Sequence, residues 1–98
     1  MTVMIIERVA PSVRGDLSRW LIEVKTGVFI GRISRLVRDK LWERALKLAE
    51  DGTVIQAWTT NTEQGFDLRY SNPKGRIPIR IEDIWLVQVA DPDPRRKP

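Results

Sequence analysis

The chain has 98 residues, of which 42% are hydrophobic and 31% charged, which is the size and composition of one globular domain. Seventeen lysines and arginines against thirteen acidic residues give a net charge of +4, and this excess favours polyanionic partners without identifying one. Cysteine and histidine are both absent, which excludes a disulfide framework, a thiolate nucleophile, a zinc-ribbon site and a histidine general base.

The first elements predicted are a buried strand and a helix. Residues 2–7 form a short apolar run that ends at Glu7, as expected of a central strand. Pro11 suits the first turn of a helix, and Gly27 is expected to end that helix. Its buried face would carry residues with helical spacing: Val13, Leu17, Trp20, Leu21 and Val24.

A second strand, helix and strand pair are expected after Gly27. Residues 28–30 are strand-like, and Ser34 is a good N-cap for a helix. The buried face of that helix is predicted to contain Val37, Leu41, Ala45, Leu48 and Ala49. Residues 53–59 and 66–70 are two further predicted strands, joined by the polar turn 60–65.

The C-terminal part contains two more extended segments. Pro78 interrupts residues 77–81, which suits an edge strand or a connector. Residues 84–89 are apolar on both faces and need a cover, whereas residues 91–98 are rich in proline and charge and are predicted to be a disordered tail. The domain is therefore placed at 1–90, with 82–90 as a C-terminal interface strand.

The predicted element order is β-α-β-α-β-β-β, an α+β arrangement with two helices on one face of a mainly antiparallel sheet. No apolar run approaches the roughly 20 residues that span a bilayer. Residues 1–6 lack the features of a signal peptide, so a cytoplasmic protein with no membrane partner is expected.

Two stretches carry a family resemblance, residues 20–31 (WLIEVKTGVFIG) and residues 57–66 (AWTTNTEQGF). Together they resemble the small subunit of the CRISPR spacer-acquisition machinery, the CRISPR-associated endoribonuclease family (Cas2), in its type I-E form. The similarity extends to about Ala90. It implies a ferredoxin-like fold, a homodimer, and contacts with the CRISPR integrase subunit (Cas1) and with double-stranded protospacer DNA.

Several cations are candidates for phosphate contact. Arg14, Arg35 and Arg38 fall in the first turns of the two predicted helices, where cations oppose the helix dipole but anions are welcome. The resemblance implies that the nucleic-acid-binding residues are Arg14, Arg38, Lys74 and Arg76. Ser12 and Gly75 stand where related sequences often carry two more cations. The alternative for each cation is a solvated surface residue.

Glu7 is the one candidate catalytic residue. The resemblance implies an acidic residue at the end of the first strand, brought by a twofold axis beside its copy to hold Mg²⁺. Two facing carboxylates could bind a hard cation and activate water. The alternative is a salt bridge from Glu7 to Arg8 or another cation. Glu63 and Glu82 match acidic positions of type I-E relatives and are either further ligands or solvated loop residues.

The aromatic residues and the last strand point to packing and to a partner. Trp20 and Trp58 are expected in the core, Trp42 half exposed beside it, and Trp85 at an interface. The resemblance implies that the terminal segment crosses to other chains, so the predicted interface residues are Ile84, Trp85, Leu86, Val87 and Val89. The alternative is an ordinary edge strand of the chain's own sheet.

Three functions compete. The first is a non-catalytic adaptor whose dimer bridges integrase dimers and supports the protospacer. The second is a Mg²⁺-dependent endonuclease acting on RNA or double-stranded DNA through Glu7. The third is a ferredoxin-like RNA-binding module, which ranks last because the sequence does not show the exposed aromatic pair that such sheets use.

Overall fold

The computed structural model describes residues 1–89, so the predicted tail at 91–98 lies outside the described residues. Two helices and seven strands follow one another along the chain: β1 (Thr2–Ile6), α1 (Pro11–Ser18), β2 (Ile22–Lys25), β3 (Val28–Gly31), α2 (Arg35–Leu48), β4 (Val54–Thr59), β5 (Phe66–Ser71), β6 (Arg76–Ile81) and β7 (Ile84–Val89). Neither helix has the length and hydrophobicity needed to cross a bilayer within these residues.

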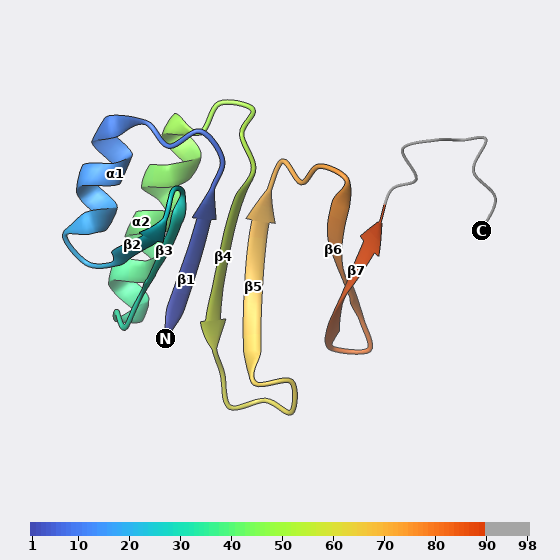
Figure 1. The fold of residues 1–98 in the computed structure, drawn as a ribbon. Coiled ribbons are helices and arrows are strands. Elements are labelled where there is room, and N and C mark those ends of the chain that lie inside the picture. Colours follow the sequence, from blue (N-terminus) through green and yellow to red (C-terminus); the bar gives the residue numbers. More distant parts are fainter. Residues whose placement is uncertain (90–98) are drawn as a thin grey trace, which may run out of the picture.

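The first five strands form one antiparallel sheet in the order β2-β3-β1-β4-β5. With the two helices between strands, this is the predicted α+β, ferredoxin-like arrangement, extended by β5. Strands β6 and β7 pair with each other in a separate hairpin, which stands beside β5 on the side away from the helices (Figure 1). We call this hairpin, residues 76–89, the C-terminal arm.

The first helix is shorter than predicted, and a strand was missed. Helix α1 ends at Ser18, and residues 22–25 form β2 instead of the last turns of a helix. Alternate β-branched residues favour a strand, and Gly27, with φ +80°, allows the tight turn between β2 and β3. The prediction of Trp20 in the core was wrong, because its side chain is 55% exposed.

Helix α2 agrees with its prediction. The Ser34 hydroxyl accepts a hydrogen bond from the Val37 N–H at 3.2 Å, which caps the helix. Leu41, Ala45 and Ala49 are buried, while Val37 and Leu48 pack partly buried against the core. This side of α2 therefore covers the sheet.

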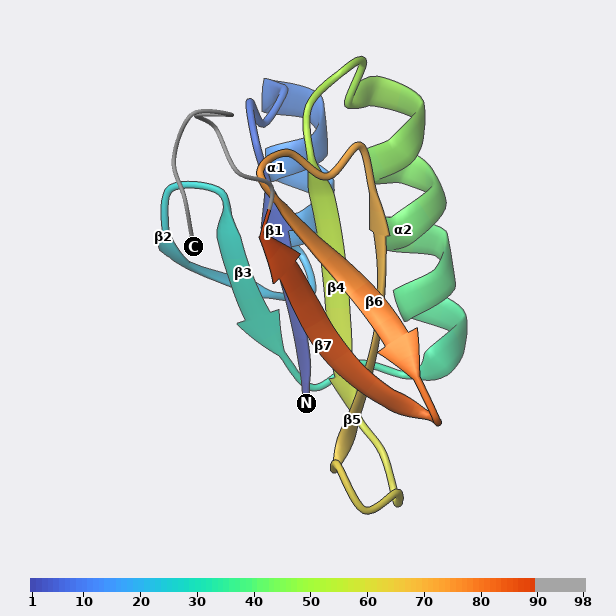
Figure 2. The ribbon, with the colours of Figure 1, turned by 90° about the vertical axis from the view of Figure 1, so that its right-hand side faces the viewer.

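The core lies between the helices and one face of the sheet. The strands contribute the buried residues Met4, Phe29 and Val54, and α1 contributes Val13 and Leu17. Met4 pairs with Phe29 and with Gln56, which shows that these residues share the helix-covered face. Figure 2 shows the sheet beside α2, with the C-terminal arm turned towards the viewer.

The hairpin geometry of the C-terminal arm accounts for its two residues with positive φ and for its proline. Glu82 and Asp83 have φ of 49° and 65°, the conformation of a two-residue type I′ hairpin turn. Pro78 pairs with Val87, and it lies on an edge strand as predicted. The predicted strand at 84–89 is present, and one of its edges is paired with β6 of the same chain.

Candidate nucleic-acid and partner interfaces

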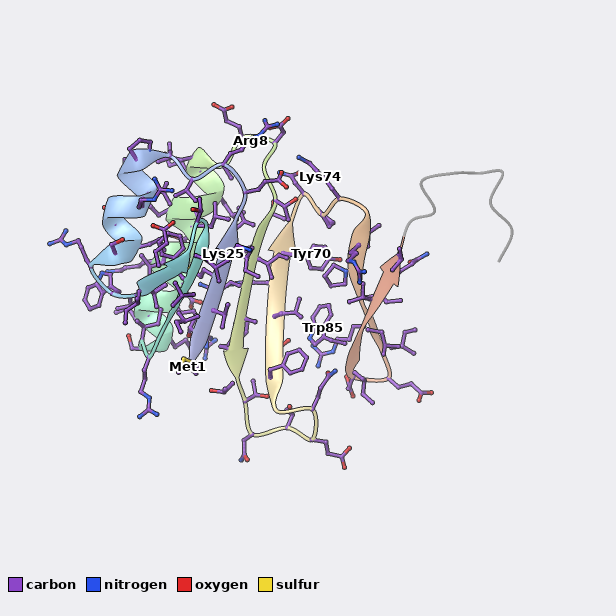
Figure 3. All side chains as sticks on the ribbon, viewed as in Figure 1. Met1, Arg8, Lys25, Tyr70, Lys74 and Trp85 are labelled. Carbon is purple, nitrogen blue, oxygen red and sulfur yellow. The ribbon has the colours of Figure 1, made fainter. Side chains whose placement is uncertain are left out.

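Glu7, Lys74 and Arg76 meet at the carboxyl end of β1. Glu7 directly follows β1, Lys74 lies in the connection between β5 and β6, and Arg76 is the first residue of β6. All three line a hollow of about 370 Å³ together with Ile5, Ile6, Thr26, Thr53, Ile55 and Pro73. Figure 3 shows Lys74 at the end of the molecule opposite Met1.

The Glu7 carboxylate forms an ion pair with a lysine side chain. Lys74 Nζ donates to Glu7 Oε1 at 2.9 Å, and both side chains are about half exposed. This hydrogen bond, with one from the Thr53 backbone, lowers the pKa of Glu7, so it is a carboxylate at neutral pH. The alternative prediction for Glu7, a salt bridge at the end of the strand, therefore describes the single chain. Its partner is Lys74 and not Arg8, because Arg8 pairs with Asp51.

The residues of one chain do not fit a magnesium ion. Among residues 1–89, no three acidic side chains gather into a potential metal site. Glu63 and Glu82 lie with Asp67 and Asp83 around a different hollow, between the 60–65 turn and the C-terminal arm. A magnesium ion at Glu7 would need ligands from a second chain and the release of Lys74.

Arg14 is held by an acidic partner on the neighbouring strand. Its Nε donates to Glu23 Oε1 at 3.0 Å, and Glu23 also accepts the Gly27 N–H at 2.9 Å. These contacts, the Gly27 hydrogen bond first, lower the pKa of Glu23. The Arg14 side chain remains 43% exposed, so part of the guanidinium faces solvent.

Arg38 has the most unusual environment of the predicted cations. Its guanidinium stacks on Trp58 at 4.0 Å from the ring centroid, and its side chain is only 17% exposed. The buried Nε has no hydrogen-bond partner within residues 1–89, since the Asp39 carboxylate is 4.0 Å away and too distant to accept. Burial lowers the pKa of Arg38, although an arginine remains charged.

A partly buried polar network lies beside Arg38 and hydrogen-bonds to its main chain. Gln56 is fully buried and donates to the Arg38 carbonyl at 2.9 Å. Its Oε1 accepts from Arg69 Nε at 2.8 Å, and Arg69 reaches Asp39 at 2.8 Å. Arg69 also lies over the rings of Trp42 and Trp58. Gln56, Arg69 and Asp39 are thus joined in one hydrogen-bonded network beside Arg38.

The predicted cations do not form one continuous patch on a single chain. Arg38 lies by Trp58, which pairs with Thr2 at the start of β1, whereas Lys74 binds Glu7 just after the end of β1. Five residues of strand separate these positions by about 16 Å. The structure brings Lys74 and Arg76 together and leaves Arg38 apart from them, while Arg14 is bonded to Glu23 beside the β2–β3 turn.

The sheet face opposite the helices is open and apolar. Residues that are directly paired across neighbouring strands lie on the same face of the sheet. The core residues Met4, Phe29 and Gln56 pair among themselves on the other face, whereas the residues of this open face pair with one another. Within the described chain, no helix covers them, and Ile22, Ile5 and Phe66 are 70%, 41% and 37% exposed. Val3, Val28, Ile30, Ile55, Ala57, Leu68 and Tyr70 are the partly buried members.

The predicted partner residues divide into two groups. Ile84, Leu86, Val87 and Val89 are exposed on the C-terminal arm, at 47–60%. Trp85 instead turns towards β5, where its indole donates to Asp67 Oδ1 at 2.8 Å and its ring packs edge-on against Tyr70 (Figure 3). This hydrogen bond is the main cause of the lowered pKa of Asp67.

Sequence reasoning missed Gln56, Gln64 and Asp67. None belongs to a motif, and each acts through long-range contacts that depend on the register of β4, β5 and the arm. A polar residue at the centre of the apolar run 54–58 was the one available signal for Gln56.

A family comparison agrees with the resemblance seen in the two sequence stretches. The model of the family described as CRISPR-associated protein (Cas_Cas2CT1978) matches residues 1–86. The chain belongs to the Cas2 family. It is thus a protein of CRISPR adaptation, and Cas2 membership implies Cas1 and DNA as partners in general terms. The observed ferredoxin-like core lies wholly within the matched residues.

Proposed function

We propose that this Cas2 protein is a non-catalytic adaptor of spacer acquisition, of the type I-E branch, whose homodimer bridges Cas1 dimers and supports the protospacer duplex. The open apolar face of the sheet is the observation that carries this proposal. It spans all five strands, and exposed apolar surface of this extent on a small domain marks an interaction site.

A second copy of the chain is the partner that we assign to this face. A twofold axis brings identical surfaces together, so each apolar residue meets an apolar residue of the partner. Lys74 and Arg76 lie at one end of the same face, so the dimer doubles this basic edge. Such a surface suits the phosphates of a duplex, which supply affinity without sequence information.

Arg38 is the most strongly favoured phosphate contact. The Arg38 side chain is 17% exposed and its Nε is buried, so the part of the guanidinium that still faces solvent beside Trp58 is the part that donates to a phosphate. Arg14 contributes through the part of its guanidinium that Glu23 leaves exposed. The exposed apolar side chains of the C-terminal arm, Ile84, Leu86, Val87 and Val89, serve the contact with Cas1.

The second candidate is a Mg²⁺-dependent endonuclease acting on RNA or double-stranded DNA. It is motivated by the position of Glu7 beside the open face, where a twofold axis would bring two copies close. The Lys74 ion pair argues against it, because the ammonium neutralises the carboxylate that the metal would need. The adaptor is therefore the better-supported function.

A reconstituted integration assay with Cas1 and a forked duplex separates the two functions. The adaptor requires that Glu7→Ala integrates at the wild-type rate and that deletion of 82–98 abolishes both Cas1 association and integration. Loss of integration by Glu7→Ala, with the Cas1 complex intact, would reject it. The nuclease is tested by incubating the purified chain with Mg²⁺ and RNA or duplex, where cleavage lost in Glu7→Ala would establish it.

A further inference from the structure

Trp85 makes most of the polar contacts between the C-terminal arm and the rest of the described residues. Within residues 1–89, and apart from the turn at the base of the arm, the hydrogen bonds between the arm and the body all involve Trp85. An Arg80–Asp67 ion pair at 3.8 Å is the other polar contact. Figure 3 shows Trp85 and Tyr70 in the space between β5 and the arm.

Gln64 binds the main chain of Trp85 in the manner of a neighbouring strand. The Trp85 N–H donates to Gln64 Oε1 at 2.8 Å, and Gln64 Nε2 donates to the Trp85 carbonyl at 2.9 Å. A side-chain amide has the same donor and acceptor as a peptide group, so it replaces one rung of a β-ladder. Glutamate lacks the donor, and asparagine is one methylene shorter.

The register of the hairpin shows which groups of β7 face outward. Ile81 and Ile84 close the two-residue turn and form a hydrogen-bonded pair. At every second residue of β7 after this pair, the main-chain N–H and C=O therefore point away from β6. Trp85, Val87 and Val89 are these outward residues. Gln64 takes the rung at Trp85, whereas within residues 1–89 no hydrogen bond reaches the main chain of Val87.

The other edge of the arm is unsuitable for pairing. Pro78 faces Val87 across the hairpin, so it occupies an outward position of β6 and has no N–H to offer. Proline on an edge is one means of preventing strand addition. The arm therefore has one edge able to accept a strand, and this edge begins just beyond the residue that Gln64 holds.

We propose that Gln64 is a positioning residue that latches the C-terminal arm to the body and confines the docking edge of β7 to Val87 and Val89, where an extended segment of Cas1 adds as a strand. This inference rests on the proposed function for the identity of the partner. The latch itself is a property of the isolated chain. Main-chain pairing gives affinity in such strand additions, and side-chain pockets give specificity.

Hydrogen exchange on the isolated chain tests the latch. Gln64→Met keeps the volume of the side chain and removes both hydrogen bonds, while Gln88→Met makes the same change at an exposed residue of the arm. We expect the arm amides of Gln64→Met to exchange roughly ten- to thirtyfold faster than those of the wild type, since two hydrogen bonds are lost. Gln88→Met should leave the rates unchanged.

The docking edge is tested by Val87→Pro, which removes the outward N–H and no bond between β6 and β7. Binding of purified Cas1 should be lost by Val87→Pro and weakened by Gln64→Met, with the arm exchange of Val87→Pro unchanged. Equal arm exchange in Gln64→Met and wild type would overturn the latch, and wild-type Cas1 affinity in Val87→Pro would overturn the docking edge. If the wild-type chain fails to bind Cas1, the proposed function falls together with the docking edge, and exchange alone decides the latch.

Discussion

Replacement of Arg38 by methionine should separate DNA binding from stability. The guanidinium gains about 2 kcal/mol from a desolvated cation–π contact with Trp58, at 4.0 Å. Against this, the buried Nε without a partner costs about 1–3 kcal/mol. These contributions nearly cancel, so Arg38→Met should change the free energy of unfolding by less than about 1 kcal/mol.

DNA affinity should respond very differently. A hydrogen bond from a charged donor contributes about 1.5–3 kcal/mol, which corresponds to a ten- to 150-fold loss of affinity for each lost contact. Each phosphate contact also contributes about 0.9 to the slope of log K against log salt concentration, so a dimer should lose about 1.8. Fluorescence anisotropy of a labelled duplex across a salt series, beside thermal unfolding, measures both quantities.

The control is Lys47→Met, which removes an exposed cation from the last turn of α2, at the other end of the helix from Arg38. The reasoning is refuted if Arg38→Met leaves the salt slope unchanged while destabilising the fold by more than about 2 kcal/mol, the full value of the cation–π contact. In that case Arg38 stabilises the fold by packing on Trp58, and the duplex contacts other basic residues.

Three further outcomes follow from the buried and strained positions. Gln56→Leu should destabilise the fold by about 2 kcal/mol in chemical denaturation, because Arg69 Nε and the Arg38 carbonyl each lose a partner; an unchanged midpoint would contradict this. Gly27→Ala should cost about 1–3 kcal/mol more than Gly65→Ala, because both glycines have positive φ but only at Gly27 does a Cβ collide, with the Ile6 carbonyl oxygen; equal costs would refute the collision. The folded-state pKa of Asp67 is lowered, so its stabilisation of the arm is present above the ordinary pKa of about 4 and is lost as pH falls through the folded value. The protection of the arm amides relative to their intrinsic exchange rates should therefore fall only at acid pH, and Trp85→Phe should remove this dependence.

Much of the fold follows from local sequence signals. Ser34 and the apolar spacing of the second helix predict α2, and the β-rich run at 53–59 predicts β4. The segment after Ser18 was misassigned, because Trp20, Leu21 and Val24 fit a helical face, whereas the alternation of a strand is carried there only by Ile22 and Val24. The turn at Gly27 decides between them, since a carbonyl of β1 packs against that glycine.

The candidate sites were less accessible to sequence reasoning. Glu7 and Lys74 are 67 residues apart in the chain, and their ion pair depends on the path of the connection after β5. Trp58 was expected to be a core residue, but it is only partly buried and supports Arg38. Trp85 was assigned to a partner interface, and that role remains a prediction, although its ring and indole bind the chain's own β5.

The mass of the protein in solution tests the central claim most directly. In the proposed adaptor a second copy covers the open apolar face, so sedimentation at micromolar concentration should give twice the chain mass of 11.4 kDa. Ile55→Asp, which places a charge in the middle of that face, should give the mass of one chain with the fold retained. A mass of 11.4 kDa for the wild-type protein under the same conditions would contradict the proposed homodimer.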